Sequence, residues 1–304
     1  MHSGRSFCHR LSRSWTRKEF DLSLITNARV QFHADLKQTL FVLDGNGKPS
    51  NADKSQSAST SIAKHLANSV GVVQGPTLKA QTAGNEFERV AAVFLEATFL
   101  KLSKLRPGDW YVHHVKSRKG VSIAQYEQYS HLGDIEKAAK KTDEIQVLLG
   151  LDYKIASDVV IARRPEPDSV LNRPTILVDD ASARRATIRA DLHPKPSLHA
   201  CISCKWTMRS DRSQNARSEA LNLIRTRRGR APHIVVLTAE PVPTRLASLA
   251  LGTGDIDCVY HIALPELEAA VTHAGQPNQI RLLKLMIDQR RLKDVSDLPL
   301  DLAL

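Results

Sequence analysis

The chain has 304 residues, of which 42% are hydrophobic, enough to bury a substantial core in one large domain or two small ones. Its 43 Lys and Arg outnumber 32 Asp and Glu, and the net charge of +11 favours an anionic partner, most commonly nucleic acid. No run approaches the roughly 20 apolar residues that cross a bilayer, and no apolar secretory signal opens the chain, so we expect a cytoplasmic protein with no membrane partner.

The cysteines also argue for a reducing compartment. The four residues Cys8, Cys201, Cys204 and Cys258 are too few and too scattered to form a disulfide framework. Cys201 and Cys204 form a Cys-x-x-Cys pair, but no second Cys or His pair stands at zinc-finger spacing. We therefore do not expect structural zinc.

Residues 1–19 carry several Arg and Lys and no acid before Glu19, which is typical of a flexible basic arm. The same residues could be translated from a start codon upstream of the true one, and their Arg and Ser bias weakly resembles a transit peptide. Residues 45–60 are rich in Gly, Ser, Asn, Asp and Lys, which predicts a polar loop. We expect residues 20–304 to form a single domain.

The first strong secondary-structure pattern is a long amphipathic helix over residues 84–105. Its apolar residues recur at intervals of three and four until Pro107 and Gly108 end the pattern; they are Phe87, Val90, Phe94, Leu95, Phe99 and Leu102. Such a helix packs against a core.

Strands and helices alternate in the second half of the chain. Short β-branched runs predict strands over residues 155–162, 175–178, 198–205, 234–238 and 256–262. Helical spacing occurs over residues 213–227, 265–272 and 280–292. The fold class predicted is therefore α/β, with a central mixed β-sheet flanked by helices.

Asp158 is the first candidate for chemistry, because it interrupts an otherwise apolar strand, Ile155 to Ile161. An unpaired buried carboxylate is costly, so Asp158 needs a cation. A structural salt bridge is the simpler explanation for an isolated Asp in a strand. The alternative is a metal site, since carboxylates that hold Mg²⁺ beside a Lys stabilise the transition state of phosphodiester hydrolysis.

The predicted strand that ends at Lys205 supplies such a Lys. Because side chains alternate along a strand, Ser203 and Lys205 share one face. A polar residue and a Lys two positions apart, beside a strand that bears an acid, resemble the PD-(D/E)xK nuclease core. That motif is loose and common by chance. Ser203 also departs from it, because an Asp or Glu is usual at that position.

Glu219, in the predicted helix 213–227, could return a carboxylate to the place that Ser203 leaves vacant. It could equally be a solvated helix residue among neighbouring arginines.

An Arg-x-Asp-Arg cluster, Arg209, Asp211 and Arg212, lies between Lys205 and this helix. Arg donates a pair of hydrogen bonds to guanine and Asp accepts from cytosine, so the cluster suits G·C pairs read in the major groove. The plainer alternative is a helix cap by Ser210 or Asp211 with solvated arginines around it.

At this point the chain resembles the NgoMIV-type, or type IIF, restriction endonucleases. The active-site and recognition segment is matched almost letter for letter by residues 202–207, 209–212 and 214–219. Further matching segments are residues 50–53, 81–82, 84–85, 87–88, 106–110, 232–236, 250–254, 256–261 and 291–294. The resemblance runs from about Phe32 to the C-terminus and leaves the basic arm unmatched.

The resemblance implies a restriction-endonuclease-like core and a role for each matching residue. Asp158 would be the principal Mg²⁺ ligand, assisted by the main-chain carbonyl of Cys204, with Lys205 orienting the attacking water. Glu219 would be the displaced acid, with Ser203 marking its usual position, and Glu88 would be a further acid near a second Mg²⁺.

The same resemblance implies how DNA is read. Arg209, Asp211 and Arg212 would read the central CCGG bases, and Gln81 and Ser55 the outer G·C pairs. The alignment at Ser55 needs a one-residue gap. The implied target is double-stranded GCCGGC, cut after the first G to leave a four-base 5′ overhang. The implied assembly is a homotetramer of two dimers, and a bacterial host would need a cognate DNA methyltransferase for protection.

Two other functions stay open from the sequence. One is a non-catalytic, sequence-specific DNA-binding protein on the same fold, against which the intact acid and Lys positions argue. The other is a structure-selective nuclease, which has little use for base-reading residues beside its active site.

Overall fold

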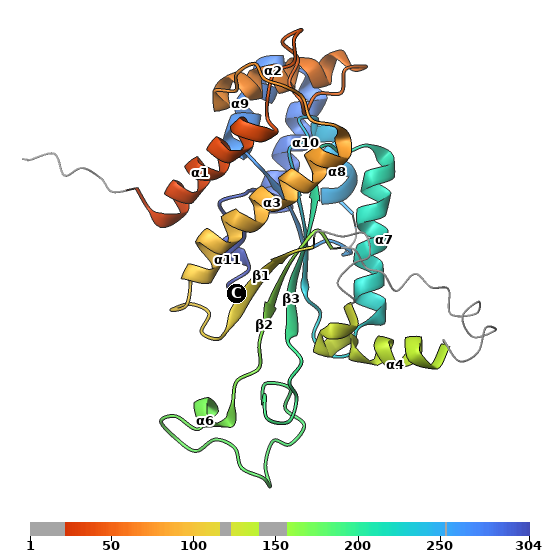
Figure 1. The fold of residues 1–304 in the computed structure, drawn as a ribbon. Helices are drawn as coiled ribbons and strands as arrows, with labels where there is room; N and C mark the ends of the chain where they lie inside the picture. The colour runs from red at the N-terminus through yellow and green to blue at the C-terminus, as the bar shows by residue number, and fades with distance from the viewer. Residues whose placement is uncertain (1–21, 116–122, 140–156, 253) are drawn as a thin grey trace, which may run out of the picture.

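A six-stranded mixed β-sheet forms the centre of the computed structural model (Figure 1), which describes residues 22–115, 123–139, 157–252 and 254–304. The basic arm predicted over residues 1–19 lies outside these ranges. The strands lie side by side in chain order: β1 (Trp110–His114), β2 (Val159–Arg163), β3 (Ser197–Lys205), β4 (His233–Thr238), β5 (Cys258–His261) and β6 (Leu292–Asp294). The pairs β1–β2 and β2–β3 are antiparallel, and β3 to β6 are parallel.

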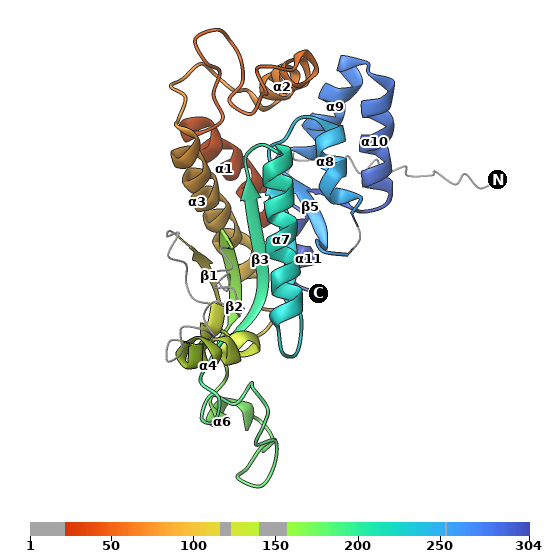
Figure 2. The ribbon, with the colours of Figure 1, turned by 90° about the vertical axis from the view of Figure 1, so that its right-hand side faces the viewer.

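Helices cover both faces of the sheet (Figures 1 and 2). On one side, α3 (Ala80–Thr98) contacts β1, β2 and β3 and packs against α1 (Leu24–Thr39). On the other side, α7 (Ser210–Thr226) packs against α8 (Pro243–Ala250), which also contacts α10 (Pro277–Asp288). The predicted α/β class with a central mixed sheet flanked by helices is confirmed.

The remaining helices are short or peripheral. The helix α2 (Ser57–Val70) packs against α9 (Leu264–Ala274) at the end of the molecule to which β3 points (Figure 2). The others are α4 (Ser130–Ala139), α6 (Asp168–Leu171), α11 (Leu298–Asp301) and the 3-10 turns η1 (Phe99–Lys101), η2 (Ile123–Gln125) and η3 (Glu127–Tyr129). None of the helices in the described ranges is both long enough and apolar enough to cross a membrane.

The core explains why the carboxyl end of β3 is held firmly. Strands β2 to β5 are buried on both faces, as expected of apolar runs between helix layers. Trp206, directly after β3, packs edge-on against Phe87 of α3 at 5.2 Å and against Phe41 at 5.6 Å between ring centroids. Lys205 is thus fixed by a buried aromatic neighbour.

Most element predictions are confirmed, with shifted ends. The helix predicted over residues 84–105 is α3, which begins four residues earlier and ends at Thr98 before η1. The predicted helix 280–292 ends at Asp288, because Arg290 adopts a positive φ of 54° and turns the chain into β6. The loop predicted over residues 45–60 ends at Gln56, because α2 begins at Ser57.

The strand predicted over residues 175–178 is wrong. These residues lie in the long excursion between β2 and β3 at the lower end of Figure 1, with Ile176 78% and Leu177 66% exposed. The side-chain oxygen of Asn172 accepts hydrogen bonds from the N–H groups of Leu177 and Val178, at 2.8 and 2.9 Å. The Asn172 side chain thus accepts the backbone hydrogen bonds that a neighbouring strand would otherwise accept.

Candidate active site

Asp158 and Lys205 meet at the carboxyl end of β3. Asp158 stands immediately before β2, and its Oδ2 accepts hydrogen bonds from the Cys204 backbone N–H at 2.7 Å and from Lys205 Nζ at 2.9 Å. Both side chains are 16% exposed.

Lys205 is held in its charged form. Burial acts to lower the pKa of Lys205, but the negative charges of Asp158 and Glu219 outweigh it and raise this pKa above its usual value. A permanently protonated Lys cannot act as a general base. It can donate hydrogen bonds and stabilise negative charge.

Two further acids approach this pair from opposite helices. Glu88 comes from α3 and Glu219 from α7. Burial is the main cause that raises the pKa of each to about 7; the charge of Asp158 adds to the rise and that of Lys205 opposes it. Oε2 of Glu88 also lies 3.2 Å from Nε2 of His114 on β1. The positive charge of Lys205 therefore acts on three acids, Asp158, Glu88 and Glu219.

These groups border a cavity of about 510 Å³. The side chains of Glu88, Lys205 and Glu219 contribute to its wall together with Cys204. Lys54, Thr207, Arg209 and Arg212 also line it, so the acids and a set of cationic side chains face the same space.

Ser203 and Glu219 lie together behind this cavity. Both line a small internal cavity of about 10 Å³ between β3 and α7, and the buried Ser203 hydroxyl has no hydrogen-bond partner in the described part of the chain. The α7 helix has thus carried a carboxylate to the vicinity of the position where the strand itself has only a Ser.

The donor set fits a hard cation. The described residues contain no group of three or more His, Cys, Asp or Glu side chains placed to hold a metal by themselves. Mg²⁺ does not require one, because it is usually bound through one or two carboxylates with water and substrate phosphate completing the shell. Glu88 and Glu219, whose pKa values are raised by burial and by the charge of Asp158, would be stabilised in their charged form by such a cation.

The cluster Arg209, Asp211 and Arg212 lies at the N-terminus of α7. Arg209 is the N-cap residue and makes no side-chain capping bond, which rules out the alternative that Ser210 or Asp211 caps this helix. Arg209 and Asp211 are exposed. Arg212 folds back on the preceding loop, where its Nη1 donates to the Thr207 hydroxyl at 2.8 Å.

Ser55 and Gln81 lie beside the cavity but do not line it. Ser55 is exposed, and its hydroxyl donates to Oδ1 of Asp53 at 2.7 Å. Gln81 is exposed in the first turn of α3. Their neighbours Lys54 and Ala80 do line the cavity.

Sequence reasoning missed two groups at this site. His114 was not anticipated because β1 has no apolar alternation. Glu240, fully buried just after β4, accepts a hydrogen bond from the Met208 N–H at 2.7 Å and so supports the loop before α7. An acid close to an apolar run, within it for Asp158 and shortly after it for Glu240, is the pattern that could have revealed Glu240.

A mixed sheet with an acid before one strand, a Lys at the end of the next and more acids from flanking helices is the arrangement of restriction-endonuclease-like nucleases. Residues 32–304 match the family model described as NgoMIV restriction enzyme. The type II restriction enzyme NgoMIV of Neisseria gonorrhoeae is 48% identical over 282 residues, which cover 92% of this chain and 99% of that protein. The chain therefore belongs to the NgoMIV family of type II restriction enzymes.

Among solved structures, one titled as a complex of the restriction endonuclease PspGI with substrate DNA aligns with 92% of this chain and 90% of that chain. Its sequence identity is 14% and its TM-score is 0.24, which is too low to establish a shared fold.

Proposed function

We propose that this protein is a Mg²⁺-dependent endonuclease that cuts double-stranded DNA at GCCGGC, after the first G, leaving a four-base 5′ overhang. The observation that carries the proposal is a cavity lined by Glu88, Lys205 and Glu219, where Lys205 also pairs with Asp158. The wall of the same cavity contains Arg209 and Arg212. Family membership supports a restriction activity, and the target site is inferred from the resemblance of the reading residues.

Asp158, Glu88 and the main-chain carbonyl of Cys204 would hold Mg²⁺, and the resemblance to the family implies two ions. Bound Mg²⁺ supplies charge stabilisation and an acidified water. Lys205, held protonated by Asp158 and Glu219, would orient that water and donate to the charge that develops on the phosphate. Glu219 would act as the displaced acid, and Ser203 marks the position it replaces.

Base reading would come from two segments and one helix end. We define the first reading segment as residues 51–56 and the second as residues 207–212. Arg209, Asp211 and Arg212 of the second would read the central CCGG bases. Ser55 of the first, with Gln81 at the start of α3, would contact the outer G·C pairs.

The working form would be a homotetramer, two back-to-back dimers that bind two DNA copies. We further propose that residues 20–304 act as one domain. An enzyme of this kind requires a methyltransferase that protects the same site in the host, which acts separately and is not a stable subunit.

The test is cleavage of a plasmid that carries two GCCGGC sites, with Mg²⁺ and with EDTA, by the wild type and by Asp158→Ala. The proposal expects cutting at GCCGGC only with Mg²⁺ and only by the wild type. Absence of cutting would refute it. Binding to GCCGGC without cutting would instead favour the non-catalytic DNA-binding protein.

A further inference from the structure

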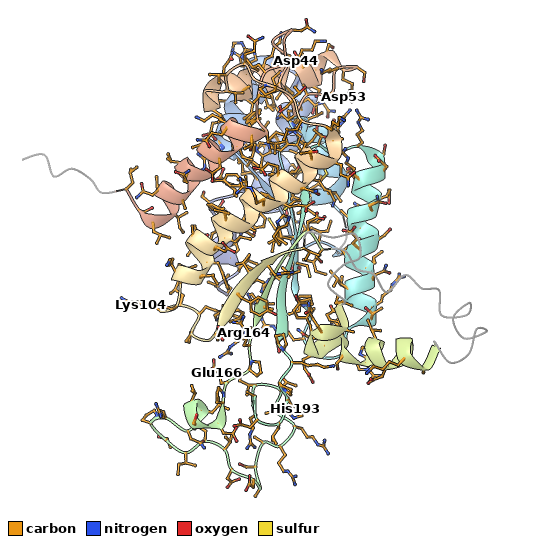
Figure 3. The ribbon with its side chains drawn as sticks, viewed as in Figure 1. Asp44, Asp53, Lys104, Arg164, Glu166 and His193 are labelled. Atoms are coloured by element: carbon orange, nitrogen blue, oxygen red, sulfur yellow. The ribbon has the colours of Figure 1, made fainter. Side chains whose placement is uncertain are left out.

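Arg245 lies between two acids that belong to different parts of the chain. It sits in the first turn of α8, where its Nη2 donates to Oδ2 of Asp53 at 2.5 Å and its Nη1 lies 3.7 Å from Oε2 of Glu240. The three side chains are 20%, 14% and 0% exposed, respectively. Figure 3 labels Asp53 in the loop before α2, at the end of the molecule where α7 and α8 begin.

This position is unfavourable for an Arg unless the acids are present. The N-terminus of a helix carries partial positive charge, so a cation in the first turn of α8 opposes the helix dipole. The guanidinium also loses water by burial. Both costs are offset because the two ends of its planar fork contact separate carboxylates.

Asp53 links Arg245 to the first reading segment. While its Oδ2 accepts from Arg245, its Oδ1 accepts from both the backbone N–H and the hydroxyl of Ser55, at 3.1 and 2.7 Å. One carboxylate thus fixes the conformation of the residue proposed to contact the outer base pair. The buried amide of Asn51 donates to the Ala239 carbonyl at 2.8 Å and ties the same segment to the chain beside Glu240.

Glu240 links Arg245 to the second reading segment. Its Oε2 accepts from the Met208 N–H at 2.7 Å, and its Oε1 accepts from the Val242 N–H at 3.1 Å. Met208 directly precedes Arg209. The buried carboxylate therefore fixes the position of the backbone just before the Arg-Ser-Asp-Arg cluster. Burial raises the pKa of Glu240 to about 7 against the opposing effects of the Met208 hydrogen bond and the Arg245 charge.

We propose that Arg245 is a positioning residue that holds the two reading segments in fixed relation to each other and thereby sets discrimination between base sequences. The inference rests on the proposed function, because it concerns how the same site reads DNA. In this role Arg245 acts through its contacts with Asp53 and Glu240, the carboxylates that hold the two segments.

The decisive variant is Arg245→Lys. Lys keeps a positive charge beside both acids, so the buried Glu240 is not left without a cation and the fold is retained. Its single ammonium cannot reproduce two nitrogen atoms that point to two different carboxylates. The matched control is Arg281→Lys on α10, where the exposed Arg donates to the nearby Asn278 side chain at 3.2 Å.

The first measurement compares kcat/KM on GCCGGC with that on duplexes that carry one altered outer or one altered central pair. Arg245→Lys is expected to lower the ratio of cognate to altered-site cleavage about tenfold, within the range of one good base contact, with a smaller effect on kcat for the cognate site. The Arg281→Lys control is expected to leave the ratio unchanged. An unchanged ratio in Arg245→Lys overturns the proposal.

The second measurement needs no DNA. Amide hydrogen exchange should show faster exchange in Arg245→Lys at both Ser55 and Met208, the two N–H groups that the linked carboxylates hold. Faster exchange at one of them, or at neither, would contradict a link between the segments. If the wild type fails to cut GCCGGC, the proposed function fails, while this exchange result still decides whether Arg245 links the segments.

Discussion

The catalytic cluster and the reading segments share one cavity but are built in opposite ways. The proposed catalytic cluster, Asp158, Lys205, Glu88 and Glu219, is partly buried between the sheet and two helices, and the pKa values of Lys205, Glu88 and Glu219 are raised there. The residues proposed to read bases stand at a helix N-terminus and in a loop, where Arg209, Asp211 and Ser55 are exposed.

This difference indicates which property each region determines, the rate of cleavage or the choice of sequence. The groups of the proposed catalytic cluster are fixed in the core, so under this proposal a cation and a phosphate would complete an arrangement that is already in place. Exposed arginines have hydrogen-bond donors that are fully used only when DNA is bound. Their positions depend on the buried residues that hold the backbone of their segment. Changes in the first region should therefore alter rate, and changes in the second should alter choice of sequence.

The largest expected effect separates the two regions at Lys205. Lys205→Met removes the cation shared by three acids, so we expect cleavage of GCCGGC to fall by at least about 10³-fold, at or beyond the loss typical of one oxyanion donor. Preference for GCCGGC over unrelated DNA in binding should persist. Single-turnover cleavage and competition binding measure the two quantities.

The matched control is Lys284→Met on the exposed side of α10, which should cut like the wild type. A Lys205→Met protein that loses sequence preference in binding along with cleavage would show that the two regions are not separable in this way.

The next largest effect concerns the displaced acid. Glu219→Ala should lower cleavage about 10²-fold, because the only carboxylate that α7 brings to Ser203 is lost. Adding Ser203→Asp should restore part of the rate, since Ser203 and Glu219 border the same small cavity. Cleavage rates of the single and double variants test this, with the exposed Glu268→Ala on α9 as control.

A double variant with an unchanged melting temperature that still cuts no faster than Glu219→Ala alone would contradict this prediction. That result would mean that Glu219 does not replace the acid usual at the position of Ser203.

How far the sequence could lead is visible in these same residues. Asp158 and Lys205 were predictable because a charge inside an apolar run needs a partner, and strand alternation limits where a side chain points. Glu219 became interpretable only through the family resemblance, since no local pattern says that a helix returns its carboxylate to the sheet. The fold class followed from the alternating helices and strands.

Other features lie beyond local patterns. The run over residues 175–178 has strand composition, but the Asn172 side chain satisfies its backbone. The contact between Arg245 and Asp53 joins segments far apart in the chain, and only the packed sheet brings them together. Periodicity reports which face is buried and not which distant residue it meets.

A smaller effect is expected in the second region at Arg212. Arg212→Ala should cost about 1 to 3 kcal/mol of discrimination at a single G·C pair and leave the rate on the best remaining sequence much less affected. Cleavage of duplexes altered one pair at a time measures this, with Arg281→Ala as control. An equal loss on unrelated DNA would make Arg212 a phosphate contact.

The smallest effect is a pH dependence that only the catalytic cluster should show. The pKa values of Glu88 and Glu219 are raised to about 7 from an ordinary 4.5, mainly by burial. Between these values the folded protein keeps protons that the unfolded chain has already lost. The stability contributed by these two acids therefore falls as pH rises from about 4.5 to about 7, and stays at its lower level above that.

Mg²⁺ competes with those protons, so its apparent affinity should rise with pH, by up to about tenfold per pH unit for each proton displaced. The increase in melting temperature caused by Mg²⁺ should accordingly be larger near pH 8 than near pH 6. Glu240 titrates in the same range but lies outside the metal site, so the comparison is with the double variant Glu88→Gln and Glu219→Gln, in which the pH dependence of the Mg²⁺ effect should vanish. Arg212→Ala should keep it. The proposal that Mg²⁺ binds beside Glu88 and Glu219 would be contradicted if the Mg²⁺-induced rise in melting temperature did not depend on pH in the wild type. It would also be contradicted if Arg212→Ala lost this pH dependence as fully as the double variant does.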